Sequence, residues 1–74
     1  MVMIKIDDLL PLMEKGWVAM DKNGEWWWFR DKPVFEGVNW QPYFNSDCHC
    51  LYELFDIAPA DDWTKSLIRV KGND

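Results

Sequence analysis

The chain has few cysteines, prolines and glycines: two, four and four among its 74 residues. The two cysteines, Cys48 and Cys50, are so close in sequence that a disulfide between them would close a small strained ring. The chain therefore lacks the cysteine framework of a small secreted domain, and we expect reduced thiols and a cytoplasmic location. The scarcity of proline and glycine, with 49% hydrophobic residues, excludes a disordered chain.

Basic residues are also scarce, with 8 Lys and Arg against 13 Asp and Glu, which gives a net charge of −5. They are scattered singly along the chain, whereas nucleic-acid binding needs a basic stripe or cluster. No segment approaches the roughly 20 apolar residues of a membrane span. We therefore expect no direct nucleic-acid binding and no membrane association, and the charge favours a protein partner with a basic surface.

Aromatic residues are abundant, with six Trp, four Phe and two Tyr. The length predicts one domain over residues 1–74, and folding at this size hides only about 60% of the surface of the unfolded chain. Each large aromatic side chain can bury roughly 150–250 Å², so these residues supply a dense core. We also expect that the interior is too small to cover all six tryptophans.

Near the N-terminus, apolar residues at helical spacing predict a short helix. They are Ile6, Leu9, Leu10 and Met13. Asp7 or Asp8 is the expected N-cap, and Pro11 is tolerated only in the first turn. Gly16 is expected to end the helix in the left-handed conformation.

Two runs rich in apolar residues over 17–29 flank a polar turn and predict a β-hairpin. The turn is either a two-residue loop on Asn23 and Gly24, or a type I turn from Asp21 with Gly24 as a left-handed bulge. We favour the bulge, because Asp is preferred at the first turn position and Gly at the fourth. The bulge puts Val18 and Met20 on one face with Trp26 and Trp28, and Trp17 and Ala19 on the other face with Trp27 and Phe29.

The rest of the chain predicts further extended segments. Alternation over 48–57 favours a strand that ends before Pro59, and 38–44 favours a short strand broken at Pro42. Residues 63–70 suit either a helical turn capped by Asp61 or Asp62 or an extended edge, and we favour a turn followed by an extended tail. The predicted fold class is α+β, a short N-terminal helix packed on a three- to four-stranded antiparallel meander.

One cluster, Asp47-Cys48-His49-Cys50, carries metal-ligand chemistry. Structural zinc normally takes four ligands, and the chain has no other Cys or His. Neighbours on a strand also face opposite ways, which keeps His49 from activating either thiol. The acidic pairs suit helix caps and the isolated glycines form no phosphate loop, so we expect no metal, no cofactor and no enzymatic activity.

The run of three tryptophans is the feature most relevant to binding. One reading is that all of them pack in the core. The other is that one face stays open as an aromatic platform for a protein partner, formed by Trp26, Trp28, Trp40 and Tyr43. Tryptophan and tyrosine concentrate binding energy at protein interfaces, and with acidic residues nearby a protein is favoured over a carbohydrate.

Two patterns resemble small proteins encoded by phages, prophages and mobile elements of gut bacteria. They are G-W-x-A-x-D-x-x-G-x-W-W-x-F over 16–29 and F-D-I-x-P-A-x-D-W-x-x-S-L-I over 55–68. The resemblance covers about half of the chain and implies an accessory gene product acting in the cytoplasm of a host cell. It brings no activity, cofactor or site residue with it.

Together these features predict a non-enzymatic accessory module that binds a host or phage protein through an aromatic face. An anti-defence inhibitor is one alternative, including a mimic of nucleic acid, although the carboxylates are dispersed along the chain. A self-associating structural protein, in which the aromatic face forms a homo-oligomer, is the other.

Overall fold

The computed structural model describes residues 3–37, 39–44, 46–51, 53 and 55–72. Within these residues the helical elements are α1 (Ile6–Leu9) and the 3-10 turns η1 (Leu10–Leu12) and η2 (Trp63–Lys65). The strands are β1 (Gly16–Met20), β2 (Trp26–Phe29), β3 (Val34–Phe35), β4 (Trp40–Gln41), β5 (Cys48–Cys50) and β6 (Ile68–Val70).

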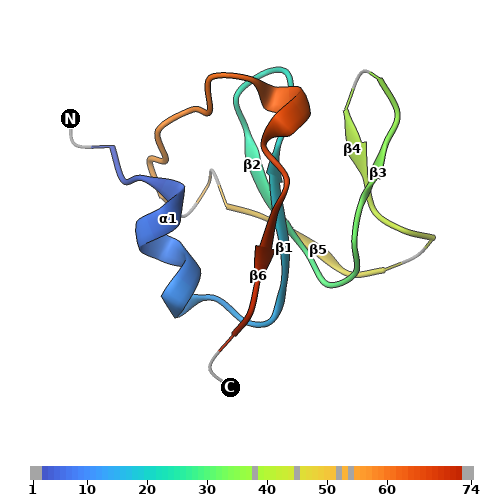
Figure 1. Ribbon diagram of the computed structural model, residues 1–74, viewed down its shortest axis with the longest axis horizontal. Coiled ribbons are helices and arrows are strands. Elements are labelled where there is room, and N and C mark those ends of the chain that lie inside the picture. The colour runs from blue at the N-terminus through green and yellow to red at the C-terminus, as the bar shows by residue number, and fades with distance from the viewer. Residues whose placement is uncertain (1–2, 38, 45, 52, 54, 73–74) are drawn as a thin grey trace.

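An antiparallel sheet in the order β5-β2-β1-β6 forms the centre of the molecule, and β3 and β4 pair in a second, two-stranded sheet (Figure 1). The α+β prediction is confirmed. The simple meander is wrong in one respect, because the C-terminal tail returns as β6 to pair with β1 at the far edge. The short strand expected over 38–44 is β4, which lies outside the main sheet; residue 38 is not among the described residues.

The hairpin adopts the bulged register that the sequence favoured. The Gly24 N–H donates to the Asp21 carbonyl at 2.9 Å, the Asp21 N–H donates to the Glu25 carbonyl at 2.9 Å, and Gly24 has a φ of 87°. Val18 lies opposite Trp28, and the remaining pairs follow the same register. The predicted division of side chains between the two faces is therefore confirmed.

The expected ends of the N-terminal helix are wrong. α1 begins after Lys5, whose side chain makes no cap, and Asp7 and Asp8 lie within the first turn, where carboxylates favour the positive end of the helix dipole. Gly16 opens β1 instead of ending the helix. A Cβ there would lie 2.5 Å from the Phe29 carbonyl oxygen, so Gly16 is required by a close approach between strands.

The main core lies on the side of the sheet that faces α1, which we call the helix side (Figure 1). Its buried members are Leu9, Val18, Met20, Trp26, Trp28, Leu51, Ile57 and Val70. The opposite face carries the buried side chains of Ala19 and Phe29. The two-stranded β3–β4 sheet lies on this opposite side. The four-stranded sheet therefore lies between α1 and the β3–β4 hairpin (Figure 1).

The C-terminal segment forms the predicted turn and extended tail. The Thr64 N–H donates to the Asp62 carboxylate at 3.0 Å, which identifies Asp62 as the cap of η2. Ser66 is buried, and its hydroxyl accepts a hydrogen bond from the Met20 N–H at 2.8 Å. This bond fixes the end of η2 to β1 just before β6 begins.

The strand expected over 48–57 is shorter, because β5 ends at Cys50. The Leu51 N–H still donates to the Trp26 carbonyl at 2.9 Å, but the Phe55 N–H then donates back to the Leu51 carbonyl at 3.0 Å and the chain turns. Residues 52 and 54 lie outside the described residues. Beyond the turn, Ile57 makes a parallel bridge with Ile4, which covers the edge of the core.

Candidate protein-contact surface

The structure buries two of the four residues predicted to contact a partner. Trp26 is 2% exposed and Trp28 is 8% exposed. Their indole N–H groups donate to the carbonyls of Ala58 and Glu14, at 3.1 and 3.2 Å. An open platform that includes these two rings is therefore wrong, because segments distant in sequence cover the helix side of the sheet and satisfy both indoles.

Trp40 is half-buried and connects β4 to the body of the protein. Its indole N–H donates to the Trp63 carbonyl at 3.2 Å, and its backbone N–H donates to the Asp21 carboxylate at 3.0 Å. The Phe35 ring packs at 5.1 Å from the Trp40 ring and 5.4 Å from the Trp63 ring. These contacts make Trp40 an anchor for the hairpin; whether it also contacts a partner stays a prediction.

Four of the six tryptophans keep part of their surface exposed, namely Trp17, Trp27, Trp40 and Trp63. The expectation that the interior cannot cover every indole is therefore confirmed. Part of this surface is shielded within the chain, since the Lys32 ammonium lies 5.7 Å from the centre of the Trp17 ring, within range of a cation–π contact.

The largest exposed aromatic groups lie on residues 31–47, which carry β3 and β4 and which we call the arm. Tyr43, the fourth predicted residue, is 50% exposed and Phe44 is 81% exposed. Their rings meet edge-on, with centroids 4.4 Å apart. With the exposed Val34 of β3, which lines a groove together with Tyr43, they form a group that we call the arm surface.

Phe44 has an unusual backbone for a phenylalanine. Its φ is 52°, in the left-handed region, which costs a residue with a Cβ about 1–2 kcal/mol. Its exposed ring recovers little of that cost by burial within the chain. The sequence analysis missed Phe44, because a left-handed conformation is expected at Gly or Asn, and the stretch around it has no hydrophobic period.

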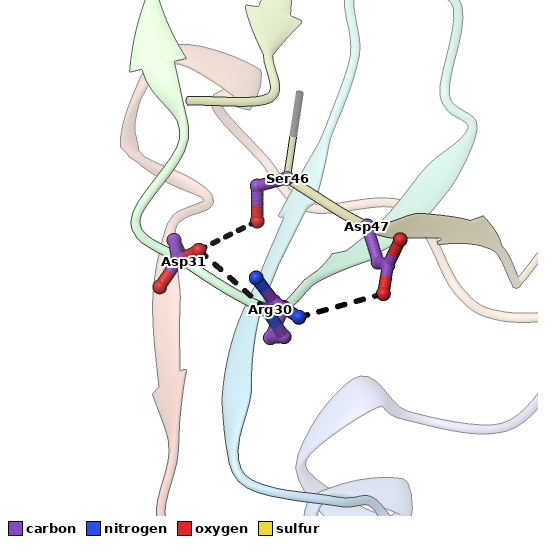
Figure 2. Close-up of polar contacts among 4 residues, drawn as sticks. All are labelled: Arg30, Asp31, Ser46 and Asp47. Carbon is purple, nitrogen blue, oxygen red and sulfur yellow. Dashed lines mark hydrogen bonds and ion pairs between the residues drawn. The ribbon is translucent and has the colours of Figure 1, made fainter. Parts of the chain in front are cut away.

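Polar contacts close the base of the arm (Figure 2). The Arg30 N–H donates to the Asp47 carbonyl at 3.0 Å, and the Ser46 hydroxyl donates to the Asp31 carboxylate at 2.7 Å. The Arg30 guanidinium lies between the carboxylates of Asp31 and Asp47, 3.7 Å from each. These ion pairs are exposed and individually weak, but with the two hydrogen bonds they hold the ends of the arm together.

A shallow groove of about 610 Å³ runs beside the arm surface. It is lined by Asp31, Lys32, Pro33, Val34 and Tyr43. Most of its lining is apolar, and one acidic and one basic residue stand at its margin. A groove of this kind can receive an apolar side chain of a partner, while Asp31 and Lys32 are available to polar groups around that side chain, as in the apolar core and polar rim of protein interfaces.

The Cys-His-Cys sequence divides between the two faces of the sheet. Cys48 and Cys50 are half-buried free thiols, paired with Phe29 and Trp27, whereas the exposed His49 ring stacks on Trp28 with centroids 5.4 Å apart. Desolvation, with the hydrogen bond and charge of Glu53, raises the pKa of the Cys50 thiol, which keeps it protonated and poorly nucleophilic at neutral pH.

The described residues bring together no group of three or more His, Cys, Asp and Glu that could hold a metal ion. Over the same part of the chain, no helix has the length and apolar character needed to cross a bilayer. Comparisons with protein-family models, curated proteins and solved structures find no match to this chain. The resemblance to phage and mobile-element proteins therefore stays a prediction.

Proposed function

We propose that this chain is a non-enzymatic protein-binding module that contacts its partner through the arm surface. The observation that carries the proposal is the presentation of Phe44, which is 81% exposed on a left-handed backbone and whose ring meets Tyr43 edge-on. The partner is a protein of the host cell or of the phage or element, as the sequence resemblance implies.

Aromatic side chains are the residues that most often dominate protein interfaces. The arm surface offers the two adjacent rings of Tyr43 and Phe44, with Val34 and Tyr43 lining a groove beside them. The polar contacts at the base and the Trp40 anchor hold these groups in place before binding. Such preorganisation lowers the conformational entropy that binding would otherwise cost.

Charge supports the choice of partner. The chain carries a net charge of −5, which speeds the approach of a partner with a basic surface and slows that of an acidic one. Affinity then depends on the desolvated aromatic contacts, because exposed ion pairs contribute little. We therefore expect binding that weakens moderately at high salt but is not abolished.

A capture experiment from host lysate tests the proposal. The double variant Tyr43→Ala with Phe44→Ala should lose at least about tenfold in capture of the partner, as expected for two interface aromatics. Leu12→Ala is the matched control, since Leu12 is an equally exposed apolar residue on η1, at 80%, and should capture normally. Equal capture by the wild type and the double variant, with both folded, would contradict the arm surface as the binding site.

Self-association through the same surface is the alternative that this geometry also allows. Light scattering after size-exclusion chromatography over a range of concentrations separates the two. A monomer at every concentration leaves the arm surface available for another protein. A dimer that dissociates in the double variant would identify a second copy of this chain as the occupant.

A further inference from the structure

A small pocket opens on the helix side of the sheet, away from the arm. Its volume is about 260 Å³, and it is lined by Met13, Glu14, Trp28, His49 and Leu51. We propose that this pocket binds a small aromatic amine, a single aromatic ring carrying a protonated amino group. The proposal does not depend on the arm surface.

The pocket exists because two covering segments end beside it. η1 ends at Leu12, and β5 ends at Cys50 before the chain turns away after Leu51. Between these ends, part of Trp28 stays uncovered, which accounts for its residual exposure of 8%. The opening is therefore a consequence of where the two segments stop along the same edge of the core.

The wall of the pocket is aromatic and held in place. The Trp28 indole N–H donates to the Glu14 carbonyl at 3.2 Å, and the missing Cβ of Gly16 lets the indole lie against β1. The His49 imidazole stacks on the same indole, with an angle of 23° between the planes. A ligand ring entering the pocket meets this pair, and aromatic rings pack on one another with a gain of about 0.5–1.5 kcal/mol beyond area burial.

The size of the pocket selects a single ring. Pockets for drug-sized ligands are about 300–1,000 Å³, so a volume of about 260 Å³ suits one ring with a short side chain. Met13 and Leu51 supply apolar surface to the lining. A single ring with a short side chain is therefore enough to fill the pocket.

Charge selects the amine. Among the described residues that line the pocket, Glu14 is the one acidic residue and none is Lys or Arg. The whole chain is also acidic. An ammonium group is favoured over a carboxylate at this position by both effects.

Titration followed by NMR tests the proposal, with 2-phenylethylamine as the probe at pH 8. We expect saturable shifts of the Trp28 indole N–H and of the amides of His49 and Leu51, with a Kd of about 1 mM, an ordinary affinity for a ligand of this size. The carboxylate analogue 3-phenylpropanoate should bind about two- to fivefold more weakly, the range expected of an exposed charge contact.

Two variants identify the groups responsible. Glu14→Gln should remove the preference for the amine, whereas Glu36→Gln, an exposed carboxylate on the arm, should leave it unchanged. His49→Ala should weaken binding severalfold without unfolding the protein, because His49 is exposed. No saturable shift at the three signals, or equal binding of the amine and the carboxylate by the wild type, would overturn the proposal. Both tests are independent of capture by the arm.

Discussion

The two sides of the central sheet treat the same residue types in opposite ways. On the helix side, Trp26 and Trp28 are buried and each indole N–H donates to a backbone carbonyl. On the arm, Tyr43 and Phe44 contact each other while their rings remain exposed. The difference teaches that covering segments, and not hydrophobicity alone, decide which aromatics become core.

Connectivity explains why the covering differs. The helix side receives residues from the N-terminal segment, from the stretch before η2 and from β6, and these include Ile4, Ile57 and Val70. The other side receives the arm, whose two strands contain two residues each. A two-residue hairpin cannot cover its own aromatics as well as those of the sheet, so some of its apolar surface stays exposed.

The largest expected effect is the loss of a buried indole. Trp26→Ala should lower the free energy of unfolding by about 4 kcal/mol, through the cavity and the lost bond to the Ala58 carbonyl. Tyr43→Ala should change it by less than about 0.5 kcal/mol, as at other exposed positions. Urea unfolding measures both, and equal losses would break the contrast between the two sides.

Two glycines sharpen the comparison at the level of the backbone. Gly16→Ala forces a methyl group within 2.8 Å of the Trp28 ring and should cost about 3 kcal/mol, as overpacking does. Gly37→Ala, on the arm, meets no atom within 4 Å but has a φ of 86°, so it should cost about 1 kcal/mol from the left-handed backbone alone. Thermal unfolding of both variants should show the larger fall for Gly16→Ala; the reverse order would contradict the close approach.

Phe44 allows backbone strain to be separated from side-chain contacts. Phe44→Gly and Phe44→Ala both remove the ring, but only Gly adopts a φ of 52° without strain. We expect the Gly variant to be more stable than the Ala variant by about 0.5–1 kcal/mol. This difference is the backbone strain that Gly relieves, reduced by the greater conformational entropy that Gly loses on folding. Equal stabilities in chemical denaturation would show that the left-handed conformation is not retained.

The smallest effect concerns Asp62, whose turn η2 also contacts the arm through Trp63. Hydrogen bonds from the Thr64 hydroxyl and backbone N–H hold the pKa of Asp62 below its ordinary value of 3.8. A lowered folded-state pKa stabilises the protein above pH 3.8, and this contribution is lost as the pH falls through the folded pKa.

Asp62→Ala should therefore show a weaker loss of stability with acid than the wild type over that window. Asp61→Ala removes the neighbouring exposed carboxylate, which makes no hydrogen bond to Thr64, and is the matched control. Unfolding midpoints measured from pH 6 down to pH 2 distinguish them. Identical pH profiles for the Asp62 variant and the wild type would remove the cap as a source of acid sensitivity.

Local chemistry made much of the fold predictable. The Asp21 to Gly24 turn specifies its own bulge, so the register of the hairpin and the sharing of faces followed from four residues. Asp62 capped its turn for the same reason. The predicted start of the N-terminal helix was wrong because Asp7 and Asp8 are equally suited to the first turn. The predicted role of Gly16 was wrong because the constraint on this residue comes from the neighbouring strand.

The candidate site was less predictable. Trp26 and Trp28 were assigned to a possible platform because the alternation of the strand gives both faces large aromatics, and period alone cannot tell which face will be covered. Tyr43 was named because it is an aromatic residue of the irregular stretch, and it is exposed; its contact with a partner stays a prediction. Phe44 was missed because its exposure and its left-handed backbone result from how the arm closes at its base.

By itself, the sequence determined the α+β class, the hairpin with its bulge and the capped turn before the tail, because each depends on interactions between residues close in the chain. Only the tertiary structure decided that β6 joins the far edge of the sheet, that Trp26 and Trp28 are core, and that Phe44 is presented to solvent. These outcomes depend on contacts between residues tens of positions apart, and a local pattern carries no information about which distant segment will complete them.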